Sequence, residues 1–110
     1  MDRILKALFF PKKPNKSLVT VEVNANALLH NIFEFQKLNG CIAPVLKSNA
    51  YGHGLLEVAK VLEEASVPFF VVDSYFEAHT LRYNNIKKPI LIIGHTLPGT
   101  IKQNKLKDIS

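Results

Sequence analysis

PFFVVDS, at residues 68–74, carries the clearest fold signal in the chain. Residues 68–72 are apolar without alternation, which is typical of a parallel strand covered on both faces. Asp73 closes this run. Ser74 and Glu77, three residues apart, have the form of a capping box, so a helix is predicted to begin here and to end near Tyr83. This region therefore predicts a strand that is followed at once by a helix.

The same alternation precedes this stretch. An apolar run at residues 41–46 predicts a strand, residues 47–54 are polar and contain two glycines, and apolar side chains recur at helical spacing from Leu55 to Ala65. Cys41 is the single cysteine of the chain, and we expect it to be a small buried hydrophobic residue. Residues 41–65 therefore predict a second strand, loop and helix.

A further unit is predicted nearer the N-terminus. Residues 18–23 are rich in β-branched side chains, which favours a strand. A helix is expected over residues 26–38, with Asn26 as its N-cap and Gly40 as the left-handed residue that ends it. Residues 1–17 contain two prolines and a lysine pair, so they are predicted to form an N-terminal extension.

Residues 89–94 predict a fourth strand, and no fifth strand is evident in the polar, lysine-rich sequence that follows Gly94. Three strand-helix alternations with short connections indicate an α/β fold with a parallel sheet. Such a sheet is either open or part of a barrel. A closed (β/α)8 barrel needs about 250 residues, and this chain has 110. A barrel formed from this chain would therefore be incomplete.

The charge and hydropathy of the sequence limit which classes of partner we expect the chain to bind. The formal net charge is +5, but the basic residues gather near the two ends of the chain. They do not interleave with aromatic residues in the way that a nucleic-acid groove requires. No apolar run approaches the roughly 20 residues that cross a bilayer. We therefore expect no nucleic-acid partner and no membrane partner, and the single cysteine is consistent with the reducing cytoplasm.

KSNAYGHG, at residues 47–54, carries the candidate chemistry, because it lies where α/β folds build their sites, between a strand and the next helix. Lys47 leaves a hydrophobic strand, so partial desolvation favours the neutral amine that forms Schiff bases. Tyr51 lies in the same loop, where its phenol can reach a ligand held above Lys47. Gly52 and Gly54 allow a tight bend before the helix.

Each of these residues also has an ordinary structural interpretation. A lysine at a strand end is more often a solvated surface residue, a Tyr-Gly pair is more often a turn, and His53 can simply cap the next helix. The sequence contains neither a nucleotide-binding glycine motif nor a metal-ligand spacing. His30, His79 and His95 are scattered, so we expect no metal site.

KSNAYGHG resembles the pyridoxal-phosphate attachment motif of the alanine racemase family, in which a lysine is followed by a small residue, Asn or Asp, and then AYGHG. The similarity extends from about Leu18 to Gly94. It implies an N-terminal (β/α)8 barrel and a C-terminal β domain. We therefore expect residues 18–110 to form an incomplete (β/α)8 TIM-type barrel of about three strand-helix units plus a fourth strand, without the rest of the barrel or the second domain.

Alanine racemases interconvert L-alanine and D-alanine for bacterial peptidoglycan synthesis, and the resemblance implies this isomerase activity. Lys47 would hold pyridoxal 5'-phosphate as an internal aldimine and act as one of two catalytic bases, and Tyr51 would hydrogen-bond the cofactor phosphate. The family forms homodimers, in which a tyrosine of the partner subunit's C-terminal domain is the opposing base. That region has no counterpart here, so the chain is expected to be an N-terminal fragment.

Two other functions stay open at this point. A pyridoxal-phosphate carrier protein has the same barrel fold and binds the cofactor without racemising, although such proteins do not usually have AYGHG after the lysine. A non-catalytic remnant would match the short length of the chain. Serine or another small amino acid also remains open as the substrate, because the residues that contact it are expected outside this chain.

Overall fold

The structure is a computed structural model that describes residues 18–100 and 109–110, so the predicted N-terminal extension at residues 1–17 lies outside the described residues. α2 is the longest described helix, with 15 residues, and none of the described helices is long and apolar enough to cross a membrane. Along the chain the elements are α2 (Ala25–Asn39), α3 (Lys47–Tyr51), α4 (Leu55–Glu63), β1 (Phe70–Val72), α5 (Tyr75–Tyr83) and β2 (Ile90–Ile92).

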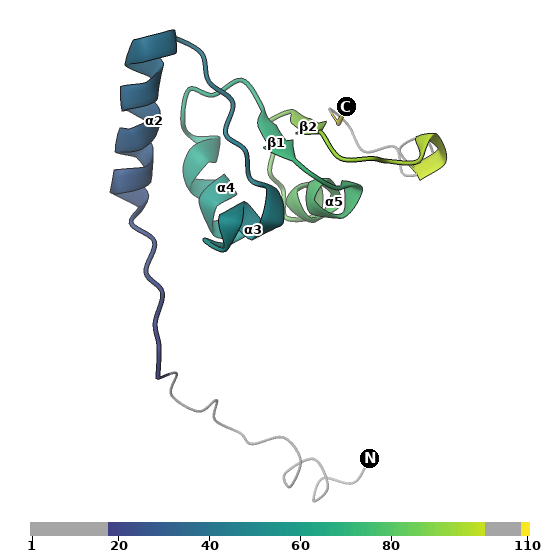
Figure 1. Cartoon of the computed structure of the whole chain (residues 1–110), viewed down its shortest axis with the longest axis horizontal. Helices are drawn as coiled ribbons and strands as arrows, with labels where there is room; N and C mark the ends of the chain where they lie inside the picture. The colour runs from purple at the N-terminus through teal and green to yellow at the C-terminus, as the bar shows by residue number, and fades with distance from the viewer. Residues whose placement is uncertain (1–17, 101–108) are drawn as a thin grey trace, which may run out of the picture.

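The sheet is parallel, as the strand-helix alternation predicts (Figure 1). β1 pairs with β2 in a register that places Val71 beside Leu91. On the other edge of β1, Val45 forms a parallel bridge with Val71, and the Leu46 N–H donates to the Val71 carbonyl oxygen at 2.7 Å. The strand predicted at residues 41–46 is therefore present as one bridged position.

The described residues after Gly94 form no strand element, although the outer edge of β2 is paired at one position. Ile109 forms a parallel bridge with Ile90, and the Ile92 N–H donates to the Ser110 carbonyl oxygen at 2.7 Å. The sequence signal is weak here because only the last two residues of the chain take part. Four parallel positions thus lie side by side, in the order Val45, β1, β2 and Ile109.

Residues 18–23 form no strand, so that prediction is wrong for this structure. Leu18 and Val21 are exposed, and the segment runs away from the body of the molecule (Figure 1). β-branched residues favour a strand only where a neighbouring strand pairs and packs with them, and this segment does not lie in the sheet. The prediction that Cys41 is buried is also wrong, because the structure leaves this residue exposed, outside the hydrophobic core.

The hydrophobic core joins the sheet to α4 and α5 (Figure 1). α4 contributes Leu62, α5 contributes Leu81 and β1 contributes Phe70, and each of these side chains is at most 1% exposed. The buried positions of α4 recur at helical spacing along its sequence, so the predicted amphipathic helix is confirmed. This core supports the turn that connects Leu46 to α4, because Leu46 and Leu55 belong to the same cluster.

α2 is confirmed as a helix but has no buried residue. Its N-cap is Asn24, whose Oδ1 accepts a backbone N–H of the first turn at 3.0 Å, so the predicted cap at Asn26 is two residues too late. Gly40 ends the helix with a φ of +72°, which glycine adopts without a steric penalty. Only one side of α2, which includes Ile32, packs partly against the core beside α4.

Candidate functional site

Lys47 begins α3, directly after the chain leaves the sheet beside Val45. The segment that follows turns in the left-handed sense. Residues 48–51 have φ values between 52° and 57°, and residues 48–50 have ψ values between 43° and 48°. A left-handed residue other than glycine costs roughly 1–2 kcal/mol. Four in succession therefore require support from the surrounding structure.

Two buried side chains anchor this turn to the core. Leu46 precedes it and is 2% exposed, and Ala50 lies within it and is 6% exposed. The Ala50 N–H donates to the Leu46 carbonyl oxygen at 2.8 Å, so the two anchors are also joined through the backbone. Gly52 then ends the turn in the left-handed region, at φ +88°. The predicted polar loop is thus a defined left-handed turn held from below by the core.

Asn49 suits this turn in two ways. Asparagine tolerates left-handed backbone better than most residues, because its short polar side chain can hydrogen-bond locally. Here Asn49 Oδ1 accepts the Leu55 N–H at 2.8 Å, and the Asn49 carbonyl oxygen accepts the Gly54 N–H at 3.0 Å. These bonds satisfy backbone donors at the start of α4. Asn49 therefore connects the turn to the helix that follows it.

His53 closes the same segment. Its ring Nδ1 lies 2.9 Å from the Ala50 carbonyl oxygen, within hydrogen-bond distance. The ordinary structural interpretation of this histidine therefore holds in the structure, although the bond is to the turn rather than to the helix start.

Lys47 and Tyr51 lie at the two ends of the left-handed turn. Lys47 is half-buried, and within the described residues its amine takes part in no hydrogen bond or ion pair. Tyr51 is 62% exposed. The structure therefore leaves an amine and a phenol available at the carboxyl end of the sheet.

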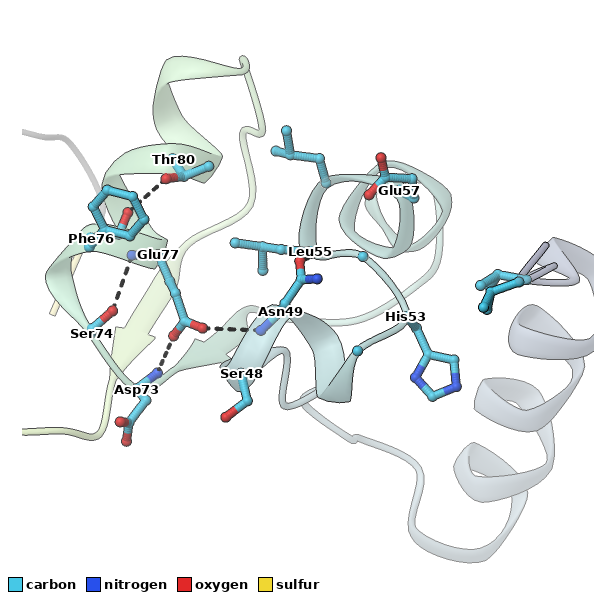
Figure 2. Close-up of a pocket in the computed structure, with 15 residues that line it drawn as sticks. Ser48, Asn49, His53, Leu55, Glu57, Asp73, Ser74, Phe76, Glu77 and Thr80 are labelled. Carbon is cyan, nitrogen blue, oxygen red and sulfur yellow. Dashed lines mark hydrogen bonds between the residues drawn. The ribbon is translucent and has the colours of Figure 1, made fainter. Parts of the chain in front are cut away.

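An open pocket of about 870 Å³ is lined by residues of the turn, α4 and α5, and by Val21 and Val23 of the segment before α2. Ser48 and Asn49 contribute to its wall, whereas Lys47 and Tyr51 do not. Figure 2 shows that the Glu77 carboxylate lies beside Asn49 at this pocket, whereas the Asp73 carboxylate points away from Asn49. The pocket therefore lies next to the turn that carries Lys47 and Tyr51, and Ser48 and Asn49 of this turn form part of its wall.

The predicted capping box at the start of α5 is confirmed in one half. Ser74 Oγ accepts the Glu77 N–H at 3.2 Å. In a capping box the glutamate carboxylate returns to the backbone N–H of the cap residue. Glu77 instead accepts the N–H of Asp73 at 3.0 Å and that of Asn49 at 3.4 Å (Figure 2). Sequence reasoning missed the contact with Asn49, because that residue is 28 positions away.

Gly94 brings the loop after β2 against the loop after β1. A Cβ atom at this position would lie 2.0 Å from the Asp73 carbonyl oxygen, which no side chain can occupy. The Ile93 N–H also donates to the Val72 carbonyl oxygen at 2.9 Å. The three strand ends that precede Lys47, Asp73 and Gly94 therefore share one edge of the sheet.

Within residues 18–100 and 109–110, no three His, Cys, Asp or Glu side chains lie close enough to hold a metal ion.

The parallel sheet, its covering helices and the lysine-bearing turn at the carboxyl end of the strands define an α/β protein of the kind that builds its site at that edge. The family model for "Alanine racemase, N-terminal domain" matches residues 23–110. The chain belongs to this family.

Curated relatives and solved structures agree with the family model. A serine/alanine racemase of Enterococcus gallinarum is 44% identical over 85 residues, which are 74% of this chain and 12% of that protein. Alanine racemase 1 of Caldanaerobacter subterraneus subsp. tengcongensis is 43% identical over 93 residues, 82% of this chain and 24% of that protein.

The solved structures of alanine racemases share the fold. That of Clostridium difficile 630 superposes with a TM-score of 0.71 at 36% identity, covering 82% of this chain and 25% of that chain. A structure from Bacillus anthracis with bound L-Ala-P gives a TM-score of 0.69 at 31% identity, covering 79% of this chain and 23% of that chain. The chain thus spans a quarter or less of the length of these proteins.

Proposed function

We propose that this chain is the N-terminal part of a pyridoxal-phosphate-dependent alanine racemase, which interconverts L-alanine and D-alanine for peptidoglycan synthesis in the bacterial cytoplasm. Membership of the family and the names of the relatives support this activity. The observation that carries the proposal is the position of Lys47, a half-buried residue that begins a defined turn at the carboxyl end of a parallel sheet.

We assign residues 18–110 to an incomplete (β/α)8 barrel, with residues 1–17 as an extension. The parallel positions at Val45, β1, β2 and Ile109 support successive barrel strands, because helices connect the inner ones. Residues 18–23 would then be the first strand of the complete barrel, although they are not part of the sheet in this structure.

The described residues fit pyridoxal phosphate. An amine that is free of hydrogen bonds and ion pairs can bond covalently to an aldehyde carbon, and within residues 18–100 and 109–110 the Lys47 amine has no such partner. The exposed phenol of Tyr51, four residues away on the same turn, can donate a hydrogen bond to a phosphate oxygen. Lys47 and Tyr51 are thus the two residues that we assign to the cofactor.

The cofactor, when bound, supplies an electron sink that weakens the C–H bond at the α-carbon of an amino acid. Lys47 would hold the cofactor before an amino acid binds, and its amine, once released from the cofactor, would take or return the α-proton on one face as a general base. The left-handed turn fixes the spacing between this amine and the Tyr51 hydroxyl. A racemase needs a second base on the other face, and we place that base outside residues 1–110, in the homodimer that the family resemblance implies.

Covalent labelling tests the cofactor assignment. The chain is incubated with pyridoxal phosphate, reduced with borohydride and mapped by peptide mass spectrometry, with Lys47→Ala as the control. We expect the label on Lys47 in the native chain and its loss in the variant. Labelling that is spread over many lysines and is unchanged in Lys47→Ala would contradict the assignment.

Deuterium exchange separates a racemase from a cofactor carrier. With pyridoxal phosphate in heavy water, we expect solvent deuterium to enter the α-carbon of one alanine enantiomer, because the chain supplies one of the two bases. NMR of the recovered alanine measures this exchange. No exchange above the Lys47→Ala background, despite a labelled Lys47, would favour the carrier function instead.

A further inference from the structure

We propose that Glu77 is the positioning residue of the Lys47 site: its carboxylate joins the left-handed turn to the loop after β1 and so fixes the relative placement of Lys47 and Tyr51. This inference rests on the proposed cofactor site. It concerns a residue that lies on a different helix, and that contacts neither the amine of Lys47 nor the phenol of Tyr51 in any described hydrogen bond.

The geometry places one carboxylate between two loops (Figure 2). Glu77 Oε2 accepts the Asp73 N–H at 3.0 Å, and Glu77 Oε1 accepts the Asn49 N–H at 3.4 Å. Both loops lie at the carboxyl end of the sheet. Because each oxygen takes a different backbone donor, a single half-buried side chain bridges the two loops, beyond the last backbone hydrogen bond that joins Leu46 to Val71.

The hydrogen bond between the Asn49 N–H and Glu77 Oε1 lies within the strained part of the turn. Asn49 is the second of four consecutive left-handed residues. Its side chain is directed toward α4, where Oδ1 accepts the Leu55 N–H, so its backbone N–H is the group left to meet α5. A hydrogen bond to a charged acceptor is stronger than one to a neutral acceptor. Glu77 thus holds the strained backbone from the side opposite to α4.

An ordinary helix cap does not account for this arrangement. Ser74 already caps α5 by accepting the Glu77 N–H. The Glu77 carboxylate takes the Asp73 N–H, one residue before the cap, and leaves its second oxygen for Asn49. The capping contribution and the turn contribution therefore belong to different side chains and can be separated by substitution.

The test compares four variants of the full chain. Glu77→Ala removes both acceptor oxygens, and Glu77→Gln keeps one of them. Ser74→Ala removes the cap but keeps the Glu77 carboxylate, and Glu64→Gln makes the same charge change as Glu77→Gln at an exposed residue at the end of α4. Two quantities are measured. One is the share of borohydride-fixed pyridoxal phosphate on Lys47 relative to the other lysines. The other is amide hydrogen exchange at Asn49 in the cofactor-free chain, with thermal unfolding as the check on folding.

We expect Glu77→Ala to lower the Lys47 share about fivefold and to accelerate Asn49 exchange by about the same factor, which is the effect of losing an ordinary hydrogen bond, because the Asn49 contact is long at 3.4 Å. Glu77→Gln should fall between this variant and the native chain, and it keeps the test valid if Glu77→Ala does not fold. Ser74→Ala and Glu64→Gln should leave both quantities within about twofold of native values.

Two results would overturn the inference. If Ser74→Ala lowers the Lys47 share as much as Glu77→Ala does, the effect is that of a weakened α5 and not of the contact with Asn49. If Asn49 exchange is unchanged in both Glu77 variants, the carboxylate does not hold the turn. Should the native chain fail to label Lys47, the cofactor proposal fails on its own, and Asn49 exchange still decides whether Glu77 positions the turn.

Discussion

Two regions have similar local sequence patterns but pack differently. One is the turn that begins at Lys47, and the other is the segment at residues 18–24 together with α2. Both combine an apolar segment with a helix that an asparagine side chain caps: Asn49 at α4 and Asn24 at α2. The turn is anchored by the buried Leu46, whereas α2 has no buried residue and the segment before it is exposed. Local signals thus form both helices, but packing makes only one of the two regions part of the core.

This difference matters for the site. Left-handed backbone is unfavourable at residues other than glycine, so the turn at residues 48–51 persists only because the core, α4 and α5 hold it. α2 has ordinary helical backbone and its own cap, so it carries no such strain, and it packs on the core only through one side. The candidate chemistry therefore depends on tertiary contacts more strongly than α2 does.

The largest expected effect on stability distinguishes the core that supports the turn from α2. Phe70→Ala should lower the free energy of unfolding by about 3–5 kcal/mol, because Phe70 is fully buried in β1 and its loss leaves a cavity. Phe33→Ala on α2 should cost less than about 1 kcal/mol, because Phe33 is 56% exposed. Urea denaturation followed by circular dichroism measures both. Equal losses would show that α2 packs as tightly as β1.

The next effect comes from the loop contact beside the site. Gly94→Ala should lower the free energy of unfolding by about 2 kcal/mol or more, because the new Cβ would meet the Asp73 carbonyl oxygen and force the two loops apart. Gly99→Ala is the matched control, since a Cβ there meets nothing within 4 Å. Thermal unfolding compares the two variants. A Gly94→Ala chain as stable as Gly99→Ala would mean that the loops do not approach as closely as the structure shows.

The smallest effect compares the two asparagine caps. Asn49→Ala should cost about 1–2 kcal/mol, because it removes the acceptor for the Leu55 N–H and places a less tolerant residue in left-handed backbone. Asn24→Ala should reduce the helicity of α2 yet change global unfolding by only about 0.5 kcal/mol, because α2 is weakly coupled to the core. Circular dichroism and urea denaturation separate helicity from stability. A larger global loss for Asn24→Ala would reverse the comparison.

Much of the fold followed from periodicity. The apolar run at residues 68–72, the helical spacing in α4 and the serine cap of α5 all predicted elements that the structure contains. Predictions failed where an element needs a distant partner. The β-branched segment at residues 18–23 is no strand because no strand pairs with it, and the bridge at Ile109 escaped notice because its partner is β2.

The same distinction between local and distant contacts applies to the candidate site. KSNAYGHG alone pointed to Lys47 and Tyr51, because side-chain chemistry and motif spacing are properties of the chain itself. The left-handed course of residues 48–51 and the destination of the Glu77 carboxylate could not be read from that motif. They depend on which groups meet across the fold: a backbone that is unfavourable locally is held by a buried Ala50 and by an acceptor 28 residues away. The sequence by itself determines which chemical groups the turn contains. The backbone strain of the turn, and the contacts that offset this strain, exist only once the chain has packed.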